Sequence, residues 1–152
     1  MNNAEIETQV QTAARLFQAG DIARADSLLS TVTQQADNHS GAWLLLARVK
    51  QKAGQRQAAV DAFQQLLRLN PGMEEAVLAL VQHHGEKQEF DQCEQLLRDA
   101  IDARPDIARY PYMLGNLYLQ QGYHANGIEQ MKKAMSIAPD NLQIQVALAE
   151  MH

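Results

Sequence analysis

Residues 40–72 read SGAWLLLARVKQKAGQRQAAVDAFQQLLRLNPG, which contains two amphipathic runs separated by a glycine at position 54. The first run places four residues at i, i+3, i+4 and i+7, on one stripe of a helix: Trp43, Leu46, Ala47 and Lys50. The second run carries Ala59, Phe63 and Leu66 on one face and ends before a proline, which disfavours helical backbone in the preceding residue. The glycine can adopt the left-handed backbone that closes a helix. The stretch therefore predicts two antiparallel helices, the first capped by Ser40.

The rest of the chain repeats this pattern with a period of 34 residues. Prolines stand at positions 71, 105 and 139. Two columns of small residues and two of mostly large apolar residues keep the same register: Ala25, Ala59, Cys93 and Gly127; Ala13, Ala47, Val81, Gly115 and Ala149; Leu29, Phe63, Leu97 and Met131; Thr12, Leu46, Leu80, Leu114 and Leu148. A period of this length is typical of stacked helical hairpins. The small columns are expected where paired helices approach most closely.

The register predicts four hairpin units, at residues 6–39, 40–73, 74–107 and 108–141, and a partial fifth unit or capping helix at 142–152, together forming one domain. Gly20 and Gly122 stand at the same turn as Gly54. The third unit has Gln88 there instead, which predicts either an early end to its first helix or a strained turn. Pro111 falls in the first turn of a helix, where a missing N–H is tolerated.

These residues resemble the tetratricopeptide repeat, whose pattern is W-x2-L-G-x2-Y, then A-x3-F, then P. The second unit supplies Trp43, Leu46, Ala47, Ala59, Phe63 and Pro71, and the fourth supplies Leu114, Gly115, Tyr118 and Pro139. The resemblance implies an all-α, right-handed superhelical solenoid of antiparallel helix hairpins. It also implies that first helices line a concave face, where partners bind as extended peptides or helices.

The residues expected on that face form an apolar column with a polar margin. We predict that the partner-binding residues are Val10, Leu44, Arg48, Leu78, Gln82, Tyr112, Met113, Asn116 and Val146. Such a groove suits a hydrophobic peptide or the apolar side of a helix. The competing interpretation is that the apolar column packs against neighbouring hairpins, because apolar stripes at helical spacing are most often core.

Composition excludes several other classes of function. A net charge of -5 argues against a general nucleic-acid binder, which normally carries a basic stripe. No apolar run approaches the ~18 residues of a membrane span, and the N-terminus lacks the pattern of a secretory signal. We therefore expect a cytoplasmic protein with no membrane insertion. A single cysteine rules out an internal disulfide framework.

The sequence predicts no catalytic residues, no metal site and no cofactor. His83 and His84 are adjacent, so on a helix they point about 100° apart and cannot share a metal as i and i+4 partners would. Cys93 belongs to a small-residue column, which predicts burial rather than nucleophilic chemistry. The chain has no phosphate-binding glycine loop and no hydrolase motif.

The last segment, LQIQVALAEMH at residues 142–152, starts a fifth unit with apolar residues that no second helix covers. The sequence as a whole predicts a scaffold that binds a peptide or helix of a partner protein and has no catalysis of its own. One alternative is the N-terminal recognition module of a larger enzyme, of the bacterial sulfotransferase or glycosyltransferase type that such repeats resemble and precede. Another is self-association through the C-terminal helix.

Overall fold

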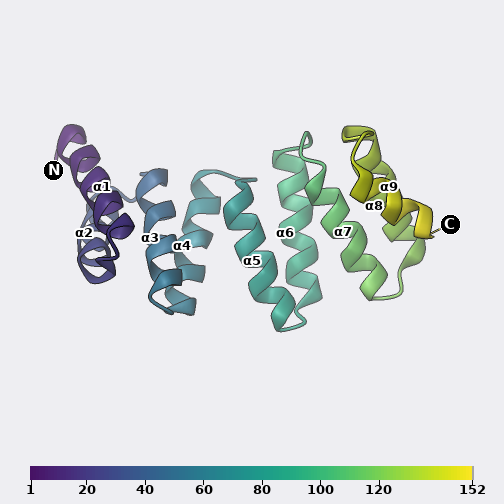
Figure 1. Cartoon of the computed structure of the whole chain (residues 1–152), viewed down its shortest axis with the longest axis horizontal. Helices are drawn as coiled ribbons and strands as arrows, with labels where there is room; N and C mark the ends of the chain where they lie inside the picture. The colour runs from purple at the N-terminus through teal and green to yellow at the C-terminus, as the bar shows by residue number, and fades with distance from the viewer. Residues whose placement is uncertain (152) are drawn as a thin grey trace. The chain divides into compact units, whose positions relative to one another are not determined.

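The computed structural model describes residues 1–151, and all regular secondary structure in that range is α-helical (Figure 1). The helices run antiparallel in successive pairs, as the sequence predicted for an all-α repeat fold. Their bounds are α1 (Asn3–Gln18), α2 (Ile22–Gln35), α3 (Ser40–Lys52), α4 (Arg56–Leu69), α5 (Glu74–Glu86), α6 (Phe90–Ala103), α7 (Arg109–Gln120), α8 (His124–Ile137) and α9 (Leu142–Met151). The chain divides into two compact units, Met1–Asn70 and a second that begins at Pro71.

The first unit contains α1 to α4, and α1, α2 and α3 share one buried apolar cluster. Small residues occupy the crossings of the first hairpin, where Ala13 and Ala25 are fully buried. Leu29 and Val32 of α2 join the cluster, and Leu46 of α3 packs in the same cluster, so the first two hairpins share a core. Burial of large aliphatic side chains stabilises such a core by about 1.5 to 3 kcal/mol each.

The second unit contains α5 to α9, and α7 and α8 approach each other closely at two glycines. Gly127 of α8 is buried, and a Cβ atom added there would lie 2.8 Å from Leu119 Cδ2 and 3.2 Å from the Gly115 carbonyl oxygen. The sequence assigned Gly115 and Gly127 to the two small-residue columns. Their backbones approach too closely for most side chains, which explains why these positions are glycines in this unit.

The third hairpin has a strained turn, and its first helix has the same length as α3. α5 runs to Glu86, so it does not end early. Gln88 instead adopts a φ of 57°, at the position where Gly20, Gly54 and Gly122 have φ of 85°, 76° and 84°. Left-handed backbone costs a residue with a Cβ roughly 1 to 2 kcal/mol. Of the two alternatives that the sequence left open, the strained turn is the one observed.

Replacing Gln88 by glycine is therefore expected to stabilise the protein by about 0.5 to 1 kcal/mol, because relief of strain exceeds the added entropy of the unfolded chain. Chemical denaturation of the wild type and the variant measures this difference. The matched control is Gly122→Gln, which creates the same strain in the fourth hairpin and should lower stability by a similar amount. A destabilised Gln88→Gly variant would contradict the interpretation of the turn.

The prediction that Ser40 caps α3 is wrong. Ser40 is the first helical residue, and the cap is His39, whose Nδ1 accepts a hydrogen bond from the Ala42 N–H at 2.9 Å. The other ring nitrogen, Nε2, lies 2.5 Å from Glu7 Oε1 on α1. The imidazole thus reaches the same amide that a serine or aspartate cap would bind, and it also links the first two hairpins.

Candidate protein-binding face

The predicted binding residues lie on the first helix of each hairpin, and the two compact units present them separately. In the first unit they are Val10 on α1 and Leu44 and Arg48 on α3. Val10 packs against the buried cluster and is half-buried, as is Leu44, whereas Arg48 is exposed. Val10 therefore follows the competing interpretation, in which the apolar column contributes to the core.

In the second unit, three of the predicted residues line one open cleft. Gln82 of α5 and Met113 and Asn116 of α7 border a cleft of about 520 Å³. The other lining residues come from α5, α6 and α7: Val81, Gly85, Glu86, Phe90, Cys93, Leu97, Leu117 and Gln120. Leu78, Tyr112 and Val146 do not line this cleft. In this unit the structure thus brings the two predicted polar residues, Gln82 and Asn116, into one cleft with Met113. The other predicted apolar residues of the unit lie outside that cleft.

The cleft has an apolar floor and an amide-rich rim. Leu97 and Cys93 are 1% exposed at its base, and Phe90 and Met113 are half-buried. Polar side chains surround these four residues at the rim. One of them, Gln82, donates a hydrogen bond from Nε2 to Glu86 Oε1 at 3.3 Å. Among the described residues that line the cleft, none is lysine or arginine. Such a surface offers hydrogen bonds to a peptide backbone beside space for apolar side chains.

The thiol of Cys93 has a structural role at the base of this cleft. Its Sγ lies 3.5 Å from the Val81 carbonyl oxygen, to which it donates. Burial raises the pKa of the Cys93 thiol, and the nearby Glu89 carboxylate adds to this effect. A raised pKa keeps the sulfur in the thiol form at neutral pH, which is the opposite of what nucleophilic catalysis requires.

The residues that the sequence analysis missed lie one turn beyond those it selected. Glu86 follows Gln82 by four positions on α5, and Gln120 follows Asn116 by four positions on α7. The polar column therefore continues along the helix axis, and its i+4 neighbours could have been listed from the sequence. The contribution of α6, through Phe90, depends on tertiary packing and had no comparable signal.

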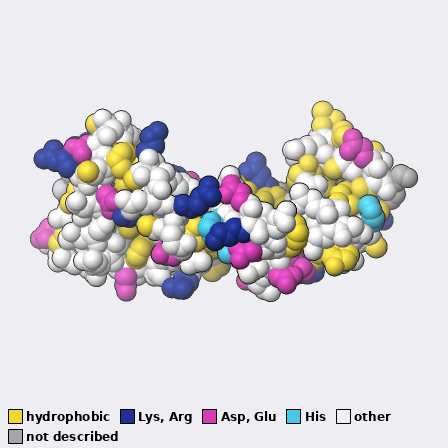
Figure 2. Space-filling model, turned by 90° about the horizontal axis from the view of Figure 1, so that it is seen from below, with side chains coloured by type: hydrophobic (Ala, Val, Ile, Leu, Met, Phe, Trp, Pro, Cys, Tyr) yellow, Lys and Arg dark blue, Asp and Glu magenta, His cyan; other side chains and the backbone are white. Residues whose placement is uncertain are grey.

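On α9 the apolar residues divide between two faces. Ile144 is buried against the preceding hairpin, whereas Leu142 and Val146 are 73% and 52% exposed. The expectation that the segment presents apolar surface therefore holds for Leu142 and Val146, and it is wrong for Ile144. On the face shown in Figure 2, acidic and basic side chains lie scattered among hydrophobic and other side chains. No helix within the described residues is long and apolar enough to cross a membrane.

The repeat register and the paired helices agree with a comparison against known families. Models described as tetratricopeptide repeat match residues 11–74, 50–117 and 108–141, which together cover positions 11 to 141. The chain belongs to the tetratricopeptide repeat family. Tetratricopeptide repeats are scaffolds for protein–protein interaction, and the hairpin architecture described above is theirs.

Individual relatives are distant. Lipopolysaccharide assembly protein B of Escherichia coli strain K12 is 24% identical over 123 residues, which are 78% of this chain and 32% of that protein. The chain thus spans about a third of this curated relative. Among solved structures, a chain of MamA from Desulfovibrio magneticus RS-1 superposes with a TM-score of 0.73 at 22% identity, covering 99% of this chain and 85% of that solved chain.

A tetratricopeptide repeat protein from Parabacteroides merdae gives a TM-score of 0.78 at 14% identity, covering 98% of this chain and 59% of that one. At such low identity, the structural similarities establish the fold. They carry no information about which surface residues bind a partner.

Proposed function

We propose that this chain binds a peptide or helix of a partner protein through the face of its first helices, and that the α5–α7 cleft is the principal contact. The supporting observation is the convergence of Gln82, Met113 and Asn116 on one cleft with an apolar floor. In this proposal the chain has no catalysis of its own and acts in the cytoplasm. The tetratricopeptide repeat architecture supports the scaffold role, and the cleft is the location that we propose for binding.

The cleft favours a particular kind of ligand. An extended peptide can place an apolar side chain over Phe90 and Met113 while its backbone donates to and accepts from side-chain amides at the rim. Amides carry both donors and acceptors, so they bind peptide backbone without selecting charge. Each such hydrogen bond contributes about 0.5 to 1.5 kcal/mol of net stability.

The variant Gln82→Ala/Asn116→Ala tests this role. It removes two rim amides without altering the apolar floor, and we expect the amount of partner recovered from source-cell lysate to fall about tenfold, equivalent to about 1.4 kcal/mol. The matched control is Gln64→Ala/Asn126→Ala, which removes the same two side-chain types from exposed positions outside the cleft. Equal recovery with both double variants, at unchanged helical content, would contradict the proposed site.

A second candidate is that the chain is the recognition module of a larger enzyme, of the sulfotransferase or glycosyltransferase type. This candidate stays a prediction, beside the fact that the chain covers 32% of the curated relative. Self-association through α9 also stays a prediction, and Leu142 and Val146 are the exposed side chains that it would use. Both candidates are compatible with a peptide-binding cleft in the second unit.

A further inference from the structure

The α5–α7 cleft lies where two helices end. Glu86 is the last residue of α5 and Gln120 is the last residue of α7, and both line the cleft. The C-terminal end of an α-helix carries a partial negative charge of about half an elementary charge, because its peptide dipoles are aligned along the axis. The Glu86 carboxylate adds a full negative charge at the same end. The cleft therefore has a negative potential beside its apolar floor.

The positive groups at this end are offset by carboxylates. α6 begins at Phe90, which lines the cleft, so the positive end of the α6 dipole also lies there. Two acidic residues, Glu89 and Asp91, flank Phe90 and oppose that positive end. Lys87 follows Glu86 at the end of α5, but it does not line the cleft. The local balance of charge is therefore negative.

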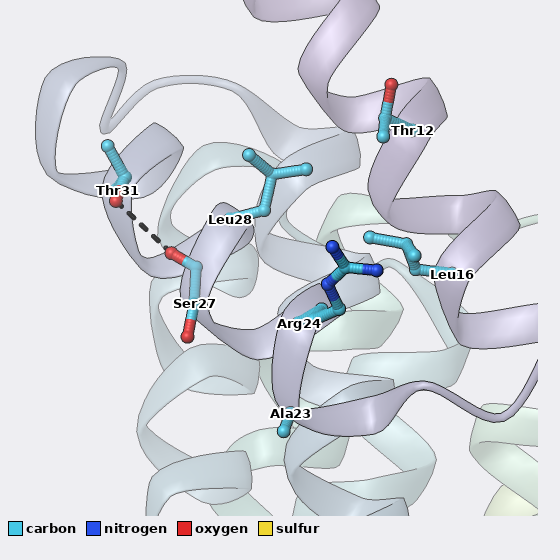
Figure 3. Close-up of a pocket in the computed structure, with 7 residues that line it drawn as sticks. All are labelled: Thr12, Leu16, Ala23, Arg24, Ser27, Leu28 and Thr31. Carbon is cyan, nitrogen blue, oxygen red and sulfur yellow. Dashed lines mark hydrogen bonds between the residues drawn. The ribbon is translucent and has the colours of Figure 1, made fainter.

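The cleft of the first hairpin is lined by a residue of the opposite charge (Figure 3). That cleft has a volume of about 630 Å³, and its apolar surface comes from Leu16 and Leu28. Among the described residues that line it, Arg24 carries the charge, and its Nη1 lies 3.7 Å from Asp21 Oδ2. In residues 71–151, by contrast, acidic side chains outnumber basic ones by twelve to six. A cationic ligand thus meets a carboxylate in the α5–α7 cleft and a guanidinium in the first one.

We propose that the occupant of the α5–α7 cleft is an extended partner peptide with a lysine or arginine two to four residues from its apolar anchor. This inference rests on the function proposed above and names the chemistry of its ligand. The spacing follows from α7, on which Met113 and Gln120 stand seven positions apart. Seven residues of helix extend about 10 Å, which an extended peptide covers in about three residues.

In this arrangement the apolar anchor packs over Phe90 and Met113, and the cation binds the Glu86 carboxylate and donates to the Gln120 amide oxygen. An ionised carboxylate can accept about four hydrogen bonds, so the bond from Gln82 to Glu86 is compatible with one from a cation. Because Glu86 is exposed, the ion pair adds little affinity by itself. Its charge mainly selects among peptides, since an acidic peptide of the same shape is repelled.

Phage display of random dodecapeptides on the full chain identifies the preferred residues directly. The selection is repeated on Glu86→Gln, which removes the charge and keeps an acceptor, and on Glu129→Gln, which makes the same change at an exposed position of α8. We expect the wild type and Glu129→Gln to select peptides with a lysine or arginine two to four positions from an apolar residue. Glu86→Gln should select the apolar residue without the cation.

Fluorescence anisotropy with the strongest selected peptide, and with its basic residue changed to glutamine, measures the contribution of the charge. We expect Glu86→Gln to lower the affinity for the basic peptide about three- to fivefold at low salt, as for an exposed ion pair. The affinity for the glutamine peptide should not change. The difference between the two peptides should shrink above about 0.5 M salt, because exposed charges are then screened.

The outcomes separate this inference from the proposed function. If the wild type selects neutral or acidic peptides, and Gln82→Ala/Asn116→Ala loses them, the charge preference is overturned and the proposed function stands. If that double variant selects the same peptides as the wild type, or if no peptide is selected at all, both are overturned. A concentration-dependent mass of the chain that Glu86→Gln abolishes would also overturn the inference, because the occupant would then be a second copy of this chain.

Discussion

Gly127→Leu is expected to lower the free energy of unfolding by about 3 kcal/mol, because it forces a side chain into the crossing of α7 and α8. The added Cβ would lie 2.8 Å from Leu119 Cδ2, which can rotate away, but also 3.2 Å from the Gly115 carbonyl oxygen, which belongs to the backbone. Overpacking of a close helix contact typically costs about 1 to 3 kcal/mol and occasionally more. Urea denaturation followed by circular dichroism measures the loss.

Its control is Asn126→Leu, which adds a leucine at the preceding, exposed position of α8. Surface substitutions of this kind usually change stability by less than about 0.5 kcal/mol. If the two leucine variants were equally stable, the close approach of α7 and α8 would not determine the residue at position 127.

Tyr110→Ala is expected to cost about 4 kcal/mol, because Tyr110 is fully buried and its removal leaves a large cavity. Tyr110→Phe isolates one part of this loss. The phenol donates to the Gly72 carbonyl at 2.6 Å, tying the loop before α5 to α7, and an unpaired buried carbonyl costs about 1 to 3 kcal/mol. Thermal denaturation should therefore rank the wild type above the phenylalanine variant and that variant above the alanine one. Equal melting temperatures for wild type and Tyr110→Phe would show that the hydrogen bond contributes nothing.

Because of Tyr110, the wild type and the Tyr110→Phe variant should differ in stability at alkaline pH. Burial, and then the nearby Glu74 carboxylate, raise the pKa of Tyr110 from 10.0 to about 12. Because the folded-state pKa is higher than the unfolded one, the stabilisation is fully present below pH 10 and is lost as the pH rises through about 12. Tyr110→Phe should not show this part of the decline between pH 10 and 12.

The sequence predicted the hairpins well because the constraints that form them recur every 34 residues. Ala25 and Gly127 are small because two helices cross there, and each is buried as expected. The His39 cap was missed because cap preferences describe short polar side chains, whereas this imidazole is held in place by Glu7 from another hairpin. A contact between residues 32 positions apart leaves no trace in local sequence.

The candidate site was only partly predictable from the sequence. Gln82 and Asn116 occupy equivalent positions on polar columns, and both reach the cleft. Val10 belongs to the apolar column predicted for the binding face, yet it packs on the first unit's core. A residue at the edge of a helix's packing stripe is covered or open according to the size of its neighbours, and helical periodicity does not encode those sizes.

Site-specific photo-crosslinking tests the central claim most directly. A benzophenone amino acid placed at position 116 in one chain, at 82 in a second and at 126 in a third samples two cleft positions and one exposed position of α8. After irradiation in source-cell lysate, we expect positions 82 and 116 to capture the same protein, with the crosslinked residue in an apolar peptide segment, and position 126 to capture none of it. Capture of that protein from position 126 alone would place the binding surface outside the α5–α7 cleft and contradict the proposed function.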